Sequence, residues 1–156
     1  MNRIILIVMC LCSLIVTPQV EAFDLFSFKV GGGYIPEGSL PGGIVKADIG
    51  PLSPFAEFFR KNSTTTVNIG ANILLIKVSA PILKPYLGAG GGISRSSGGG
   101  RSKVRSLITG IAGADLKLTE SLHVFGQAKY LYTHGSGRFM IREVALQGGL
   151  VFGIGL

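Results

Sequence analysis

Three residues near the carboxyl end of the chain have side chains that catalyse acyl transfer in many hydrolases. His134 and Ser136 are separated by one glycine, and Glu143 follows within the next few residues. In such a set the histidine takes the proton of the serine hydroxyl, and the carboxylate orients the histidine. The chemistry requires the three side chains to converge. Whether they do depends on the backbone elements that carry them.

A second stretch, Lys84–Ser96 (KPYLGAGGGISRS), is glycine-rich and contains an arginine, as a phosphate-binding loop can be. It does not fit the G-x-G-x-x-G pattern, because Ile93 stands where the last glycine belongs, and no helical pattern follows to supply an N-terminus for the phosphate. On a β-strand, Gly88, Gly90 and Gly92 share one face. We expect this face to line a narrow barrel and to leave room for long side chains from opposite strands.

The sequence offers no cofactor or metal site. Cys10 and Cys12 both lie in the apolar segment at the amino end, and His123 and His134 have no acidic or histidine partner at ligand spacing. We therefore assign no cofactor-binding residue and no metal ligand.

The amino-terminal segment 1–22 has the pattern of a secretory signal peptide. A basic start at Arg3 is followed by the apolar run Ile4–Val16, and compact residues precede a cleavage point after Ala22. We expect export of the remaining domain, residues 23–156. Export excludes nucleic acid as the partner that the net charge of +7 would otherwise suggest.

The domain after Ala22 shows hydrophobic alternation with a period of two, which is typical of half-buried β-strands. In one such run Val67, Ile69 and Ile73 alternate with polar residues and glycine. Proline and glycine clusters separate the runs. The pattern predicts eight strands, at about 24–35, 43–50, 55–62, 65–78, 85–95, 104–118, 121–133 and 140–155.

The composition of the two strand faces predicts which one meets lipid. No run after Ala22 is long and apolar enough for a membrane helix, and the polar face is mostly Gly, Asn, Ser and Gln with isolated charges. A soluble barrel would carry many more charges outside. We therefore predict an all-β fold, an eight-stranded antiparallel up-and-down transmembrane β-barrel, with a soluble lipocalin-like carrier as the alternative. Candidate interfacial aromatics are Phe26, Phe28 and Tyr34 at one end, and Tyr130 and Tyr132 at another.

Charged residues divide between the polar face and one end of this barrel. Those on the polar face are expected to pair across the lumen, with Lys117, Lys129, Asp115 and Glu143 forming a charge-paired plug and Lys46, Asp48 and Glu57 also facing inward. About half of the basic residues are expected at the outer rim, where they would bind phosphate or, alternatively, only keep the loops soluble. They are Arg60, Lys61, Arg95, Arg101, Lys103, Arg105, Arg138 and Arg142.

The predicted register argues against the hydrolase set. His134 and Ser136 continue the lipid-facing register of Tyr130 and Tyr132, whereas Glu143 falls on the lumen side. We interpret 133–138 as a polar hairpin tip. No catalytic residue is assigned, and we predict that the protein is not an enzyme.

Three segments carry a resemblance to a known family: Pro85–Gly91, Gly113–Val124 and Gly148–Ile154. Through them the chain resembles the small eight-stranded outer-membrane β-barrel proteins of Gram-negative bacteria. The resemblance implies location in the cell outer membrane, with outer-membrane lipid, lipopolysaccharide and the assembly machinery as partners, and we expect a monomer. It implies a structural or surface-interaction role.

The His134, Ser136 and Glu143 set is also similar to that of the outer-membrane lipid A deacylases, which share this barrel. Gly137 stands where those enzymes have an asparagine. A deacylase-like hydrolase is therefore the enzymatic alternative.

Overall fold

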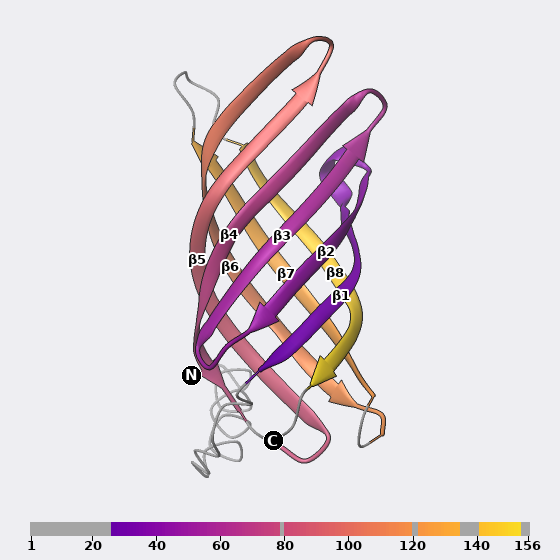
Figure 1. Cartoon of the computed structure of the whole chain (residues 1–156), viewed down its shortest axis with the longest axis vertical. Coiled ribbons are helices and arrows are strands. Elements are labelled where there is room, and N and C mark those ends of the chain that lie inside the picture. The colour runs from indigo at the N-terminus through magenta and orange to yellow at the C-terminus, as the bar shows by residue number, and fades with distance from the viewer. Residues whose placement is uncertain (1–25, 79, 120–121, 135–140, 154–156) are drawn as a thin grey trace, which may run out of the picture.

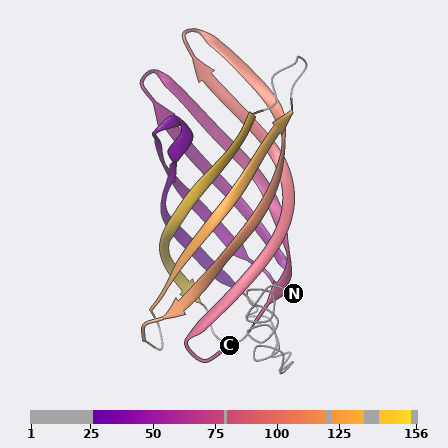
Figure 2. The ribbon, with the colours of Figure 1, turned by 180° about the vertical axis from the view of Figure 1, so that it is seen from behind.

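The computed structural model describes residues 26–78, 80–119, 122–134 and 141–153. These residues form one closed antiparallel barrel in which neighbouring strands are consecutive in the chain and β8 pairs with β1. Figure 1 shows the strands tilted relative to the long axis, and Figure 2 shows the barrel from the opposite side. The strands are β1 Ser27–Ile35, β2 Leu40–Asp48, β3 Leu52–Lys61, β4 Thr64–Lys77, β5 Leu83–Gly98, β6 Arg101–Lys117, β7 His123–His134 and β8 Ile141–Gly153.

The prediction of an eight-stranded up-and-down barrel is confirmed. Three strands begin three residues earlier than predicted, β2 at Leu40, β3 at Leu52 and β6 at Arg101. The connector before β3 is shorter than expected because Gly50 and Pro51 alone make the turn. Ile49 and Leu52 close it with two backbone hydrogen bonds, and Gly50 adopts a φ of 57° that favours glycine. The predicted signal segment 1–22 lies outside the described residues.

The turns divide the barrel into two ends. The β1–β2, β3–β4 and β5–β6 connections, the last residue of β7 and the first residue of β8 lie at one, here called the hairpin end, and β1 begins and β8 ends at the other, the terminal end. The β1–β2 connection contains a short 3-10 helix, η1 Pro36–Gly38. The longest hairpin, β5–β6, turns through Gly99 and Gly100, both at positive φ, as a two-residue turn between twisted strands requires.

The outer face of the barrel is apolar. Every strand carries at least one large exposed hydrophobic side chain on this face, and Ile69, Ile73 and Ile108 are each more than half exposed. Charged side chains are buried on the inner face. A soluble lipocalin-like barrel has the opposite arrangement, so this alternative does not fit the structure. No helix among the described residues is long and apolar enough to cross a membrane.

Exposed aromatic residues lie near both ends of the outer face. Phe28 and Phe152 pair across β1 and β8 near the terminal end, with Phe26 beside them in the chain. Tyr34 lies at the opposite end of β1, towards the hairpin end, as does Tyr130 on β7. The prediction that Tyr34 shares an end with Phe26 and Phe28 was wrong, because one strand carries the chain across the whole barrel. The two groups of exposed aromatic residues, one near each end of the barrel, suit the two interfaces of a bilayer.

Candidate functional site: the barrel lumen

The lumen near the terminal end is filled by an ion-paired cluster around Lys29. Its ammonium nitrogen lies 2.6 Å from both carboxylate oxygens of Asp115 and 2.9 Å from Oδ2 of Asp48. The second oxygen of Asp48 accepts a hydrogen bond of 2.6 Å from the hydroxyl of Ser53. Lys29 and Asp48 are almost completely buried. Burial of these charges is tolerated because each has a partner of opposite sign in contact.

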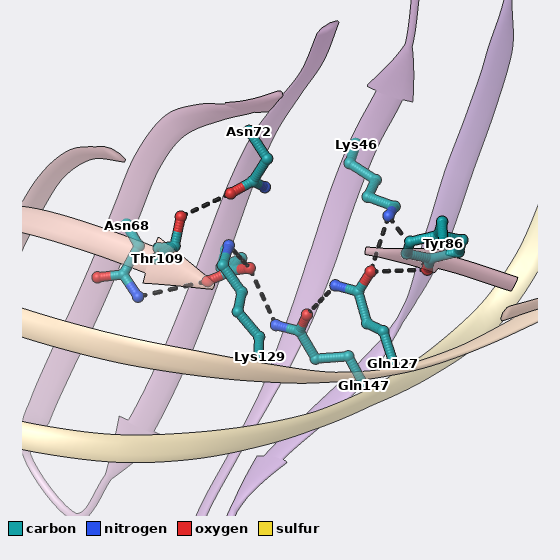
Figure 3. A network of polar contacts seen from close by, with 9 residues as sticks. Lys46, Asn68, Asn72, Tyr86, Thr109, Gln127, Lys129 and Gln147 are labelled. Atoms are coloured by element: carbon teal, nitrogen blue, oxygen red, sulfur yellow. Dashed lines mark hydrogen bonds and ion pairs between the residues drawn. The ribbon is translucent and has the colours of Figure 1, made fainter. Parts of the chain in front are cut away.

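A chain of hydrogen bonds crosses the middle of the lumen (Figure 3). Lys46 on β2 donates to Oε1 of Gln127 at 2.7 Å, and the hydroxyl of Tyr86 donates to the same oxygen at 2.9 Å. The Gln127 amide donates to Gln147, whose own amide donates to Glu57 at 3.0 Å. The chain thus joins side chains from five strands, which fixes their positions relative to one another.

Lys129 and Glu57 form the second ion pair of the lumen. The ammonium of Lys129 donates to Oε1 of Glu57, and it lies 3.1 Å from the centroid of the Phe55 ring. The other oxygen of Glu57 accepts from the amide of Asn68 at 3.4 Å. Between β6 and β4, Thr109 donates to Asn72. The ammonium of Lys129 is therefore held by the carboxylate of Glu57 and by the face of the Phe55 ring.

The buried charges of the described lumen balance. Three lysines (Lys29, Lys46 and Lys129) face three carboxylates (Asp48, Glu57 and Asp115). Aromatic rings pack against these charges, and the ring centroid of Tyr86 lies 4.7 Å from the ammonium nitrogens of both Lys29 and Lys46. An eight-stranded barrel has an interior that side chains can fill completely. We call this set of buried side chains the lumen plug; it comprises the three lysines, the three carboxylates, Tyr86, Phe55 and the side chains that hydrogen-bond to them.

The predicted lumen residues are largely placed as expected. Lys46, Asp48, Glu57, Asp115 and Lys129 are all buried inside. Lys117 is not part of the plug: it is exposed at the end of β6, where the strand has left the packed interior. Glu143 faces the lumen, half-buried, near the hairpin end, and is not paired in the plug.

The sequence analysis missed two groups of lumen residues, Lys29 and the inward-facing aromatic residues. Lys29, the centre of one cluster, lies in the short alternation of Phe26, Phe28 and Val30, which signals its inward position. Tyr86 and the phenylalanines of β3 were missed for another reason, since an aromatic residue fits either face. Phe55 and Phe59 point inward and the adjacent Phe58 outward.

The lumen glycines are inward-facing as predicted, but for a different reason. A Cβ added at Gly90 would overlap the backbone oxygen of Ala71 on the adjacent strand, and one at Gly92 would overlap that of Ile69. Neighbouring strands therefore approach too closely for any side chain at these positions. Glycine is required at these positions because the adjacent strand lies so close, more than to leave room for long side chains from opposite strands.

The structure separates the predicted hydrolase residues that it describes. His134, the last residue of β7, is exposed and pairs with Ser106 on the outer register, whereas Glu143 lines the lumen. Ser136 lies outside the described residues. Among the described residues no group of three histidine or acidic side chains is placed to bind a metal ion.

The basic residues predicted at one rim do gather at the hairpin end. Arg60 and Lys61 end β3, Arg95 lies near the end of β5, and Arg101 and Lys103 begin β6. All five are exposed, as is Arg142 at the start of β8, while Arg105 is half-buried in the mouth of the lumen. Arg138 lies outside the described residues.

A closed barrel with an apolar outer face and an ion-paired interior defines the class of eight-stranded transmembrane β-barrels. The comparisons with solved structures agree. Neisserial surface protein A (NspA) matches with a TM-score of 0.60 at 18% identity, over 86% of this chain and 100% of that one. The N-terminal β-barrel domain of Pseudomonas aeruginosa OprF matches with a TM-score of 0.56 at 13% identity, over 85% and 100%.

A de novo designed transmembrane β-barrel also matches, with a TM-score of 0.52 at 19% identity, over 86% of this chain and 98% of the design. The fold is therefore that of the small outer-membrane β-barrels. No protein-family model and no curated protein matches the sequence.

Proposed function

We propose that this protein resides in the outer membrane as a monomeric barrel with a sealed lumen and acts without catalysis, as a structural or surface-interaction protein. The observation that carries the proposal is the contrast between its faces. Apolar side chains cover the outside, and the lumen plug fills the inside with three lysines and three carboxylates. A barrel built in this way is stable in lipid and leaves no wide path for solutes.

Cell fractionation tests the location. We expect the protein in the outer-membrane fraction, inserted there by the assembly machinery after removal of the signal segment 1–22. The folded barrel is expected to migrate differently in gels before and after boiling, because the closed sheet resists detergent until heated. Recovery in the soluble periplasmic fraction without heat-modifiable mobility would refute the proposal.

The exposed basic residues at the hairpin end support a surface role. If this end faces outward, Arg60, Lys61, Arg95, Arg101 and Lys103 meet the phosphates of lipopolysaccharide, for which arginine supplies paired donors. Arg95 already donates from Nε to the hydroxyl of Ser102 at 3.0 Å, which fixes the β5–β6 hairpin beside it. An ordered set of cations binds a multivalent anion better than scattered ones.

Binding of lipopolysaccharide to the purified barrel tests this role. The double variant Arg101→Gln with Lys103→Gln should weaken binding several-fold, and Lys117→Gln, an exposed change at the terminal end, should not. Equal weakening in both would mean that net charge alone matters. If neither variant weakens binding of lipopolysaccharide, the basic residues at the hairpin end serve only to keep the loops soluble.

Mass analysis of extracted lipid A tests the absence of catalysis. Because His134 lies on the outer register and Glu143 in the lumen, we expect no loss of an acyl chain on expression of the wild type. A loss that Ser136→Ala abolishes would make the protein a deacylase.

A further inference from the structure

A cavity of about 90 Å³ lies in the lumen above the plug, at the hairpin end. Its walls come from all eight strands, and its rim residues Arg105 and Glu143 are half-buried. Deeper in, the side chains of Phe59, Leu107 and Leu131 are almost completely buried and form an apolar floor. The cavity is large enough for a few waters or for one small molecule.

Two deeply buried polar atoms on the cavity wall have no hydrogen-bond partner among the described residues. Oδ1 of Asn68 and Oγ1 of Thr133 belong to residues that are 3% and 8% exposed. The amide nitrogen of Asn68 donates to Glu57, so its oxygen necessarily points away from the plug. An unsatisfied buried polar group costs on the order of 1–3 kcal/mol, so such atoms usually mark the site of a missing partner.

The two charges on the cavity wall are also unpaired with each other. Arg105 on β6 and Glu143 on β8 line the same cavity, and no ion pair within 4.0 Å joins them in the described part of the chain. A guanidinium binds a carboxylate through two parallel hydrogen bonds. A carboxylate, an amide oxygen and a hydroxyl oxygen are three acceptors, and a primary ammonium has three N–H groups to donate.

From this arrangement we infer that the cavity binds a small zwitterion that carries a primary ammonium and a carboxylate, of the class of α-amino acids with a short apolar side chain. Glu143, Asn68 and Thr133 accept hydrogen bonds from the ammonium, and Arg105 binds the carboxylate. The side chain packs on Phe59 and Leu107. The inference is independent of the rim's proposed contact with lipopolysaccharide, which uses exposed residues.

Nuclear magnetic resonance of the full barrel, refolded in lipid nanodiscs, tests the inference with L-alanine as the probe. The methyl signal of Thr133 and the side-chain amide of Asn68 should shift saturably at concentrations in the millimolar range. Glycine betaine is the matched control ligand, because its trimethylated nitrogen has the same charge and no N–H group. It should cause no saturable shift.

Variants separate recognition from non-specific binding. Glu143→Gln and Arg105→Gln should each weaken L-alanine binding at least tenfold, and Thr133→Val, which keeps the side-chain shape, should weaken it several-fold. Lys103→Gln, exposed on the same strand as Arg105, should not change it. Each variant is first shown to be folded by its heat-modifiable gel mobility.

Three results would overturn the inference. One is the absence of any saturable shift with L-alanine in the wild type, which would mean that the cavity holds only water. Another is equal binding of glycine betaine, and the third is unchanged affinity in the folded Glu143→Gln and Arg105→Gln variants.

Discussion

The lumen plug and the cavity above it lie in the same barrel and use the same kinds of residue, yet they differ in how their polar groups are satisfied. In the plug, Lys29 and Lys129 each contact a carboxylate within hydrogen-bond distance. In the cavity, Arg105 and Glu143 form no ion pair with each other, and Asn68 Oδ1 has no hydrogen-bond partner in the described part of the chain. Paired groups stabilise a fold, whereas unpaired groups are available to a ligand. We therefore expect substitutions in the plug to change stability and substitutions in the cavity to change binding.

The largest effect is expected from Lys129→Met in the plug. It removes the cation that faces Glu57 and leaves a buried carboxylate without an ion-pair partner. The free energy of unfolding should fall by about 3–5 kcal/mol, measured by urea unfolding of the barrel in lipid vesicles. Lys103→Met, the same substitution at an exposed position, is the control and should change stability little.

A double variant sharpens this prediction. Glu57→Leu added to Lys129→Met removes the stranded carboxylate, so the double variant should be more stable than Lys129→Met alone. If Lys129→Met were no more harmful than Lys103→Met, the plug would not be the stabilising region that the comparison requires.

The next effect is expected from a lumen glycine. Gly90→Ala places a methyl group against the backbone of Ala71 and should cost about 1–3 kcal/mol of unfolding free energy. Gly126→Ala, on the outer face with nothing within 4 Å of the added carbon, is the matched control. Equal stability of the two variants in the same urea assay would show that strand curvature at Gly90 adapts without cost.

A smaller effect is expected from Tyr86→Phe. The change keeps the ring that packs beside Lys29 and Lys46 but removes the hydroxyl that donates to Gln127. Gln127 still accepts from Lys46, so the loss should be about 1 kcal/mol. A loss as large as that of Lys129→Met would mean that the hydrogen-bond chain acts as one cooperative unit.

The smallest effect on stability is expected in the cavity. Arg105→Gln should change the free energy of unfolding by no more than about 0.5 kcal/mol, because Arg105 is half-buried and not ion-paired to Glu143. Urea unfolding is again the measurement. A loss of several kcal/mol would contradict the division between a stabilising plug and a binding cavity.

Strand number, strand order and the choice of inner and outer face could be read from the sequence. Alternation such as that of Val67, Ile69 and Ile73 fixes which side chains share a face, and the low charge content of the polar face then assigns it to the lumen. The lumen positions of Asp48, Glu57 and Lys129 follow from it.

The pairing of charges inside the lumen could not be read in this way. Alternation gives the face of a residue but not its height along the barrel, which depends on strand tilt and stagger. Asp115 therefore pairs with Lys29, far away in sequence, and not with Lys117 on its own strand. The register slips by one residue between Leu74 and Ile76 because of a β-bulge, which no simple period predicts. The cavity was missed for the same reason, since its wall combines residues from every strand.

The central claim is that the lumen plug seals a membrane-spanning barrel, and planar-bilayer recording tests it most directly. Purified protein with heat-modifiable mobility is reconstituted and its current is recorded under applied voltage. Because three buried lysines and three buried carboxylates, together with aromatic rings, fill the lumen below the cavity, we predict no steady open-channel current. A large, steady conductance from the folded wild-type protein would contradict the account.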